Sequence, residues 1–467
     1  MTVDLVITNA RVFVLGELVE AGLAIDEGKI ASIAKEAHLP AGGSTIDAHG
    51  NVILPGTIDT HVHLRDPGPP SYFHEDFQTG TESAACGGAT TVLEMPMEGP
   101  YISTVAALKE KMEDAKRKAV VDYALYGGVD PTRLEGIAEL AREGVIGYKI
   151  LMWPPQTPTS KLSSAPFPVT SDDKSLLAAF YEISKTGLPV STHAENWQMI
   201  EYYTEIIKQQ GRKDPLAHCD ARPEITEIDA ISRAILIAKE CKAKLLVAHM
   251  STEGGAELVR RAKRAGQDLA AETCPHYLLF TREDMEKLGP YAKVMPPIRS
   301  KSEVAALWEA VNDGTVDVIG TDHTARLAEE KEPGRKDIWA GMAGMPGVET
   351  KLPLMLTQVN SGRLSLARLV QILSENPARL FGLYPRKGVI QVGSDADLVL
   401  VDMKQESQIR DEDLHCLIKR TPFSGWRVRG VPIRTLIRGQ TVVENRDVVG
   451  KAGIGMFLPG KLQKREG

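Results

Sequence analysis

The chain lacks several features that mark common classes of protein. Its 467 residues include only five cysteines, which are odd in number and form no CxxC pair. They are scattered along the chain, at Cys86, Cys219, Cys241, Cys274 and Cys416. This usage excludes a disulfide scaffold or a cysteine-based zinc module, so we expect reduced thiols in a cytoplasmic protein.

Long apolar runs and an excess of positive charge are also missing. No stretch approaches the ~18 apolar residues of a membrane span, and the start of the chain lacks the basic and apolar regions of a signal peptide. The net charge is -7, the sequence pI is about 6.0, and Lys and Arg form no block. We therefore expect neither a membrane nor a nucleic acid as the main partner.

The order of short apolar runs divides the chain into three regions. Residues 1–54 and the part from Gly388 onward carry short β-like runs separated by turn residues, whereas strand-like and helix-like segments alternate between them. We predict a catalytic domain over residues 55–385. Residues 1–54 and 386–467 are predicted to pair into one composite β-sandwich domain.

The central region is predicted to be an α/β fold. Short runs rich in Val, Ile and Leu favour strands buried on both faces. Helical patterns lie between them, at residues 104–118, 173–186, 226–241 and 254–265. This alternation is typical of a parallel sheet built from βα units, and over this length it favours a (β/α)8 TIM barrel.

Polar residues recur at the ends of these predicted strands. His61 and His63 are two residues apart, so on a strand they point to the same face and could grip one metal ion. Four other apolar runs also lead into such residues, namely Lys149, His193, His249 and Asp322. Taken singly, each is better explained as a core histidine, a helix cap or a paired lysine. Together, at matching strand ends of one barrel, they predict a shared site.

Several motifs resemble those of the cyclic amidohydrolases, which include hydantoinase (dihydropyrimidinase), allantoinase and dihydroorotase. The resemblance covers nearly the whole chain. It rests on residues 56–63, 87–92, 95–96, 147–149, 193–196, 248–251, 272–277, 296–299, 320–323, 376–379 and 388–399. It implies a (β/α)8 barrel of the metal-dependent amidohydrolase superfamily with a terminal β-sandwich.

The resemblance also implies two divalent metal ions, most often zinc, with manganese, cobalt or iron as other possibilities. His61, His63 and Asp322 would bind the more buried ion, and His193 and His249 the outer one. Lys149 would bridge both ions as an N-carboxylated lysine. An unmodified lysine is a cation without a lone pair, and two neighbouring cations should lower its pKa enough to let it take up carbon dioxide.

The implied reaction opens a cyclic amide to an N-carbamoyl product. A hydroxide shared by the two ions would attack the ring carbonyl, and Asp322 would carry the proton to the leaving nitrogen. The expected substrate is a small cyclic amide. The family also suggests a homodimer or homotetramer.

The choice of substrate is less sharply indicated. Arg65 resembles the carboxylate-binding arginine of dihydroorotase, although a loop salt bridge explains it equally well. The sequence around Lys149 and residues 122–128 and 331–339 resemble hydantoinase and allantoinase. The last two stretches especially resemble the hydantoinase that prefers L-substituents. Asn196 and His323 are further candidates for substrate contact, with orientation of Asp322 as the alternative for His323.

Two loops and one further histidine complete the candidates. Residues 153–172 could form a lid over the metals and residues 65–76 a second gate, with Tyr72 and Phe73 touching a ring substituent. Ordinary surface loops are the alternative for both. His276 is predicted to be structural.

Two other classes of protein compete with this hypothesis. A non-catalytic scaffold of the same fold would have lost metal ligands, yet all six expected positions are filled here. A one-metal deaminase of the wider superfamily would share the histidines and the aspartate but would not need Lys149.

Overall fold

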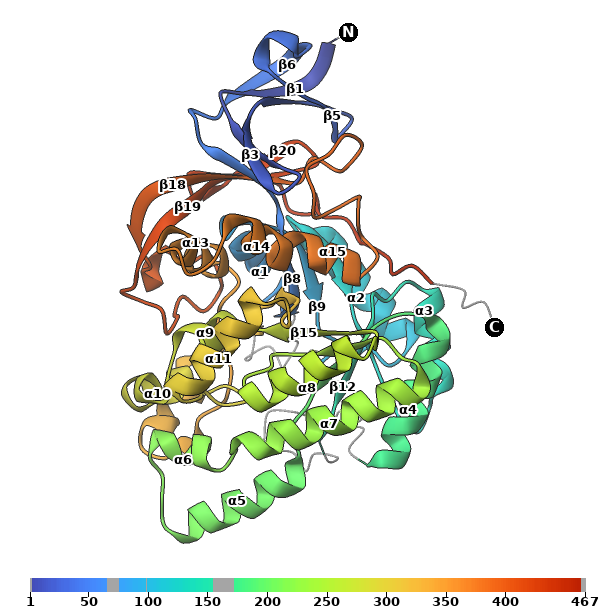
Figure 1. Cartoon of the computed structure of the whole chain (residues 1–467), viewed down its shortest axis with the longest axis vertical. Helices are drawn as coiled ribbons and strands as arrows, with labels where there is room; N and C mark the ends of the chain where they lie inside the picture. The colour runs from blue at the N-terminus through green and yellow to red at the C-terminus, as the bar shows by residue number, and fades with distance from the viewer. Residues whose placement is uncertain (1, 65–74, 98, 154–171, 463–467) are drawn as a thin grey trace.

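The computed structural model describes residues 2–64, 75–97, 99–153 and 172–462. A barrel with its surrounding helices forms the larger part of the molecule, and two sheets stand at one end of it (Figure 1). The N-terminus lies at the far end of these sheets. The predicted fold class is confirmed by this arrangement.

The barrel strands are parallel and follow one another in chain order. They are β8 (Thr57–His63), β9 (Ala89–Glu94), β10 (Asp122–Leu125), β12 (Tyr148–Leu151), β13 (Val190–His193), β14 (Leu245–Val247), β15 (Leu269–Thr273) and β16 (Val318–Ile319). The two-residue strand β11 (Gly127–Gly128) pairs with β12, and β17 (His323–Thr324) closes the ring by pairing with β8.

Helices cover the outside of the barrel and lie between successive strands. The longer ones are α1 (Phe77–Cys86), α2 (Val105–Lys118), α3 (Glu135–Arg142), α4 (Asp173–Thr186), α7 (Glu224–Cys241), α8 (Glu253–Arg264), α11 (Lys301–Asn312) and α13 (Lys351–Asn360). The four predicted helical segments match α2, α4, α7 and α8 to within two residues at each end. Polar caps begin several of them, as where Thr104 accepts from the Ala107 amide.

Further helices occupy the connections between these elements. They are α5 (Trp197–Gln209), α6 (Pro215–Asp220), α9 (Pro275–Leu279), α10 (Arg282–Leu288), α12 (Ala328–Lys331), α14 (Leu366–Val370) and α15 (Asn376–Leu380). Helix α5 projects from the end of the molecule opposite the two sheets (Figure 1). Among the described residues, no helix combines the length and apolar content needed to cross a membrane.

The two sheets draw on both ends of the chain. One contains β5 (Lys29–Ala34), β4 (Gly22–Asp26), β1 (Thr2–Thr8) and β6 (Ala41–Asp47). The other joins β2 (Arg11–Val14), β3 (Glu17–Glu20) and β7 (Val52–Pro55) to β18 (Leu398–Gln408), β19 (Arg427–Ile437), β20 (Gln440–Glu444) and β21 (Asp447–Val448). The antiparallel pairing of β7 with β18 joins the N-terminal and C-terminal segments of the chain within this sheet.

The prediction of a β-strand beginning at Gly388 is wrong. Residues 388–393 form turns rather than a strand, with Gly388 and Gly393 at φ of 81° and 90°. An added Cβ at Gly388 would lie 2.4 Å from the Ser374 carbonyl oxygen, so the close approach demands glycine. Ile390 is nevertheless buried in the core between the sheets. The apolar residues of this run are explained by burial and not by a strand.

The barrel strands bury side chains of two kinds. One cluster of buried apolar side chains draws on several of these strands, with Ile58, Leu93, Ala124, Leu246 and Val318 among its members. Further along β8, Thr60 and His61 are buried polar residues. The strands therefore carry both apolar and buried polar side chains.

Candidate metal centre

Six predicted side chains lie at the carboxyl ends of the barrel strands. His61 and His63 are on β8, Lys149 is on β12 and His193 ends β13. His249 follows β14 by two residues, and Asp322 lies between β16 and β17. Parallel strands of a barrel end at one rim, so these elements bring the six residues to a single place.

One half of the cluster is centred on Asp322. Its Oδ1 lies 3.3 Å from His61 Nε2 and 3.2 Å from His63 Nε2. Ligand atoms of these three residues all lie within 4.8 Å of one another. Lys149 Nζ is 3.5 Å from His61 Nε2 and the side chain is buried. This spacing would let one ion contact several of these atoms.

The other half is formed by His193 and His249. Their facing nitrogens, His193 Nδ1 and His249 Nε2, are 3.0 Å apart. The rings of His61 and His249 have centroids 5.3 Å apart, which links the two halves. The two halves therefore form one continuous cluster.

Glu272, on β15, fixes the orientation of His61. Its Oε1 accepts from His61 Nδ1 at 2.8 Å, and its Oε2 accepts from Thr60 Oγ1 at 2.5 Å. With the proton on Nδ1, the Nε2 of His61 presents its lone pair to the cluster. Sequence analysis missed this role, although Glu272 stands in the 272–277 motif at a strand end.

Glu195 acts in the same way on His193. Its Oε2 is 2.9 Å from His193 Nε2 and 2.5 Å from an Arg222 guanidinium nitrogen. The proton on Nε2 leaves His193 Nδ1 free to act as a ligand atom. This residue was also missed. Its place two positions after a strand-end histidine was the available signal.

The electrostatic environment suits ligation. Burial lowers the pKa of His193 and of His249, so both rings are neutral and can offer lone pairs. Burial opposes ionisation of Asp322, but nearby His61 and the hydrogen bond to His63 outweigh it and hold the Asp322 pKa well below its usual range. Neutral imidazoles and an ionised carboxylate are the donors that a zinc-like ion prefers.

Local backbone geometry is unusual at two of these positions. His249 has φ of 37° and Asp322 has φ of 50°, in the left-handed region that costs energy for residues with a Cβ. The pairing of β8 with β9 is also irregular between Asp59 and Val62. Such features cluster at functional sites, where they redirect side chains.

Lys149 fits the cluster only after modification. It is buried beside the His61 ring, and an ammonium there would repel any bound cation. A carboxylated lysine would instead supply anionic oxygen atoms. The other five residues fit a pair of divalent ions as they stand.

Trp153 is the first residue of the predicted lid, residues 153–172. Its indole ring contacts His193, with centroids 4.8 Å apart, and lies 5.7 Å from the Trp197 ring. These side chains form an apolar wall beside the cluster. Residues 154–171 of the lid, and the gate residues Arg65, Tyr72 and Phe73, lie outside the described residues.

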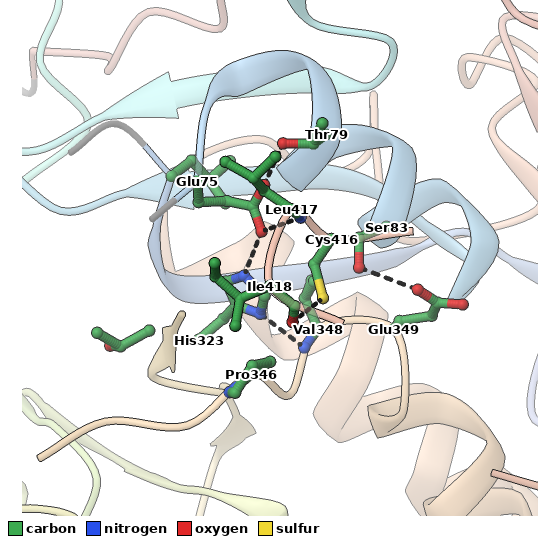
Figure 2. Close-up of polar contacts among 12 residues, drawn as sticks. Glu75, Thr79, Ser83, His323, Pro346, Val348, Glu349, Cys416, Leu417 and Ile418 are labelled. Atoms are coloured by element: carbon green, nitrogen blue, oxygen red, sulfur yellow. Dashed lines mark hydrogen bonds and ion pairs between the residues drawn. The ribbon is translucent and has the colours of Figure 1, made fainter. Parts of the chain in front are cut away.

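Two predicted substrate contacts have other partners. Asn196 caps α5 by accepting from the Met199 amide at 3.2 Å, and its Nδ2 donates to Asp229 at 2.7 Å. His323 Nδ1 accepts from the amides of Gly347 and Val348 (Figure 2). These contacts favour structural roles and give no support to substrate binding.

His276 is wholly buried, and burial lowers its pKa to about 4. Its ring packs against that of Tyr277, with centroids 4.2 Å apart. This environment agrees with the structural role expected for it.

Known proteins are similar to this chain over most or nearly all of its length. The Amidohydrolase family model matches residues 52–442. An L-hydantoinase of Paenarthrobacter aurescens is 40% identical over 97% of this chain and 98% of its own length. An allantoinase of Rubrobacter xylanophilus is 38% identical over 99% of both chains. A dihydroorotase of Methanosarcina mazei is 34% identical over 99% of both.

Solved structures are also similar to this chain over nearly its whole length. The L-hydantoinase (dihydropyrimidinase) from Arthrobacter aurescens superimposes with a TM-score of 0.92 at 39% identity, covering 98% of this chain and all of its own. A dihydropyrimidinase from Brevibacillus agri has a TM-score of 0.89 at 31% identity, over 99% of both chains.

Proposed function

Because the chain belongs to the amidohydrolase family, we propose that it opens a cyclic amide ring by hydrolysis, giving an N-carbamoyl product. The observation that carries the proposal is the convergence of His61, His63, Lys149, His193, His249 and Asp322 at one rim of the barrel. Full-length relatives at 32–40% identity that are named hydantoinase and allantoinase support this reaction.

We propose that two divalent metal ions, most often zinc, occupy the cluster. His61, His63 and Asp322 would hold one ion, His193 and His249 the other, and carboxylated Lys149 would contact both. Such ions would lower the pKa of a shared water and polarise the carbonyl of the ring.

Asp322 is proposed to move the proton. Its carboxylate is ionised and lies at the centre of the cluster, so it can accept a proton from the attacking water. It would then donate that proton to the ring nitrogen as the C–N bond breaks, acting first as general base and then as general acid. Glu272 and Glu195 hold the histidine rings so that the site needs little reorganisation.

A five-membered ureide ring of the hydantoin or allantoin type is the proposed substrate class. The relatives named L-hydantoinase and allantoinase are 40% and 38% identical, against 34% for the dihydroorotase. Dihydroorotate is the second candidate, because Arg65 stands where a carboxylate-binding arginine is expected. The apolar wall of Trp153 and Trp197 suits a hydrophobic ring substituent better than a carboxylate.

A substrate panel tests the proposal. Purified protein is assayed with hydantoin, a 5-substituted hydantoin of each hand, dihydrouracil, allantoin and dihydroorotate, after chelation and after addition of zinc or manganese. We expect metal-dependent opening of a hydantoin or of allantoin. Turnover of dihydroorotate alone would favour the second candidate.

Metal content separates the competing classes. A scaffold relative would bind little metal, and a one-metal deaminase would bind one ion per chain. We expect two ions per chain, together with a peptide containing Lys149 that is heavier by one carbon dioxide under non-acidic conditions. Addition of bicarbonate should speed reactivation of the metal-free protein.

We also propose that residues 1–54 and 386–467 form one domain and residues 55–385 the catalytic domain. The shared seven-stranded sheet supports this division. A homodimer or homotetramer is the proposed assembly, and sedimentation at several protein concentrations tests it.

A further inference from the structure

His323 accepts hydrogen bonds at one nitrogen of its ring and faces a buried carboxylate with the other. Its Nδ1 accepts from the amides of Gly347 and Val348, at 3.1 and 3.3 Å. A nitrogen that accepts hydrogen bonds carries no proton, so the proton of the neutral ring must be on Nε2. That nitrogen faces Glu75 Oε2 at 3.5 Å, and both side chains are only 1% exposed (Figure 2).

Glu75 is itself held from two directions. It lies two residues before α1 and accepts from Thr79 Oγ1 on that helix. The amide of Leu417 also lies 3.2 and 3.3 Å from its two oxygens. Leu417 belongs to the connection between β18 and β19, here called the C-terminal strap and defined as residues 414–421. Glu75 therefore joins the strap to the barrel.

The contact between His323 and Glu75 matters because His323 is next to Asp322, whose backbone conformation is unusual. Asp322 has φ of 50°, in the left-handed region that residues with a Cβ seldom adopt. The neighbouring residues hold it there: the Thr321 amide donates to Asp59 at 3.1 Å, and the Thr324 amide donates to the Met345 carbonyl at 3.0 Å. His323 is the adjacent residue, and its buried ring is the side-chain anchor on that side.

We propose that His323 and Glu75 are positioning residues, which hold the Asp322 carboxylate in the direction that proton transfer requires. The inference rests on the proposed role of Asp322 and replaces the predicted contact between His323 and substrate. A fixed ring next to a strained residue prevents the chain from relaxing into an ordinary conformation. The strap thus stabilises the active site although it lies outside the barrel.

Glu349 provides a matched control. It is 5% exposed and also holds the strap, since it accepts from the His415 amide at 2.8 Å and from His415 Nδ1 at 3.0 Å. Ser83 and Arg446 donate to it as well. These hydrogen bonds and ion pairs of Glu349 involve Ser83, His415 and Arg446 and not His323. Loss of Glu349 should therefore weaken the strap without altering the contacts of the His323 ring.

The main test uses His323→Asn. The asparagine oxygen can replace Nδ1 as acceptor for the two amides, but nothing then reaches Glu75. We expect kcat to fall between about tenfold and about a hundredfold, as for a misplaced catalytic group, with KM within about twofold. Metal content per chain should stay at the wild-type value. Glu349→Gln should lower the melting temperature and leave kcat unchanged.

A double-mutant cycle then asks whether the two residues act together. Glu75→Gln should lower kcat as His323→Asn does, and the double variant should be little worse than either single variant. Multiplying effects would contradict a pair that acts as one unit. A raised KM with unchanged kcat in His323→Asn would instead show that His323 contacts substrate.

Hydrogen exchange gives a readout that does not depend on turnover. Amides of residues 321–324 should exchange faster in His323→Asn and Glu75→Gln than in Glu349→Gln. Equal exchange in the three variants would overturn the inference. If the wild-type protein opens no cyclic amide, the proposed function fails, and the exchange comparison still decides whether the pair orders Asp322.

Discussion

At the scale of single residues, the site depends on side chains that are not themselves the expected ligands. Glu272 and Glu195 each bind one ring nitrogen of a histidine and leave the other directed into the cluster. A histidine without such a partner can rotate or carry its proton on the wrong nitrogen. Metal affinity should therefore be sensitive to these two carboxylates.

Glu272→Gln tests this dependence. The amide keeps the size of the side chain but removes the charge that stabilises His61 as a ligand. We expect metal affinity to fall by about tenfold to about a hundredfold, measured by competition with a chelator of known affinity. Glu286→Gln, at an exposed position of α10, controls for the loss of one negative charge. An unchanged affinity in Glu272→Gln would show that His61 is oriented by the backbone alone.

Asp322→Asn tests the proton transfer. The amide cannot accept a proton at neutral pH, so we expect kcat to fall by about a hundredfold or more. Metal content must be measured in the same samples, because Asp322 is also a proposed ligand. Activity close to that of the wild type, with both ions present, would contradict the proposed mechanism.

At the scale of elements, the strand ends set the positions of the groups and the following helices fix the loops. Asn196 illustrates this division, because it follows β13 and begins α5. Its side chain satisfies the Met199 amide, which would otherwise lack a partner in the first turn of the helix. A polar residue just beyond a strand end can therefore serve the helix and not the substrate.

Asn196→Ala distinguishes the two roles. Loss of a helix cap should lower the free energy of unfolding by about 1 kcal/mol and leave KM within about twofold. Thr104→Ala removes the corresponding cap of α2 and should behave alike. Chemical denaturation and steady-state kinetics provide the measurements. A large rise in KM for Asn196→Ala alone would restore the predicted substrate contact.

At the scale of the whole molecule, buried ion pairs join the barrel to the sheets. Lys387 contacts Asp122 at the start of β10 as well as Asp395 and Asp397 just before β18. Arg438, just after β19, also contacts Asp122. These three carboxylates lie close enough to resemble a metal site. The paired cations explain them instead as a structural network.

Lys387→Met should separate stability from catalysis. Removing the cation leaves buried carboxylates without their main partner, which typically costs about 3–5 kcal/mol. We expect a lower melting temperature and an unchanged kcat for the folded fraction, because the network lies at the opposite end of the barrel from the cluster. An unchanged melting temperature would show that Arg438 and Lys29 compensate.

The same network predicts a response to acid. Burial would raise the pKa of Asp395, but Lys387 and neighbouring cations lower it to about 2. The unfolded chain therefore binds a proton at higher pH than the folded chain does. The contribution of Asp395 to stability is present above pH of about 4 and is lost as the pH falls toward 2. Urea unfolding across that interval should show a smaller decline in Asp395→Asn.

Much of this architecture was predictable from local patterns. Apolar runs followed by polar residues placed His61, His193 and Asp322 at strand ends, and helical periodicity gave α4 its observed bounds. These patterns succeed because a buried parallel strand and an amphipathic helix impose their own spacing on the sequence. The run at residues 388–393 failed because apolar residues are also buried in turns.

The amino-acid sequence by itself determined the fold class, the ring of strands and the six side chains at its rim, since each depends on periodicity and on neighbours along the chain. The tertiary structure alone decided which residues support them. Glu272 meets His61 across 211 positions, and the Leu417 amide meets Glu75 across 342. Such contacts leave no local pattern, because they arise only when the closed barrel and the returning C-terminal chain bring distant segments together.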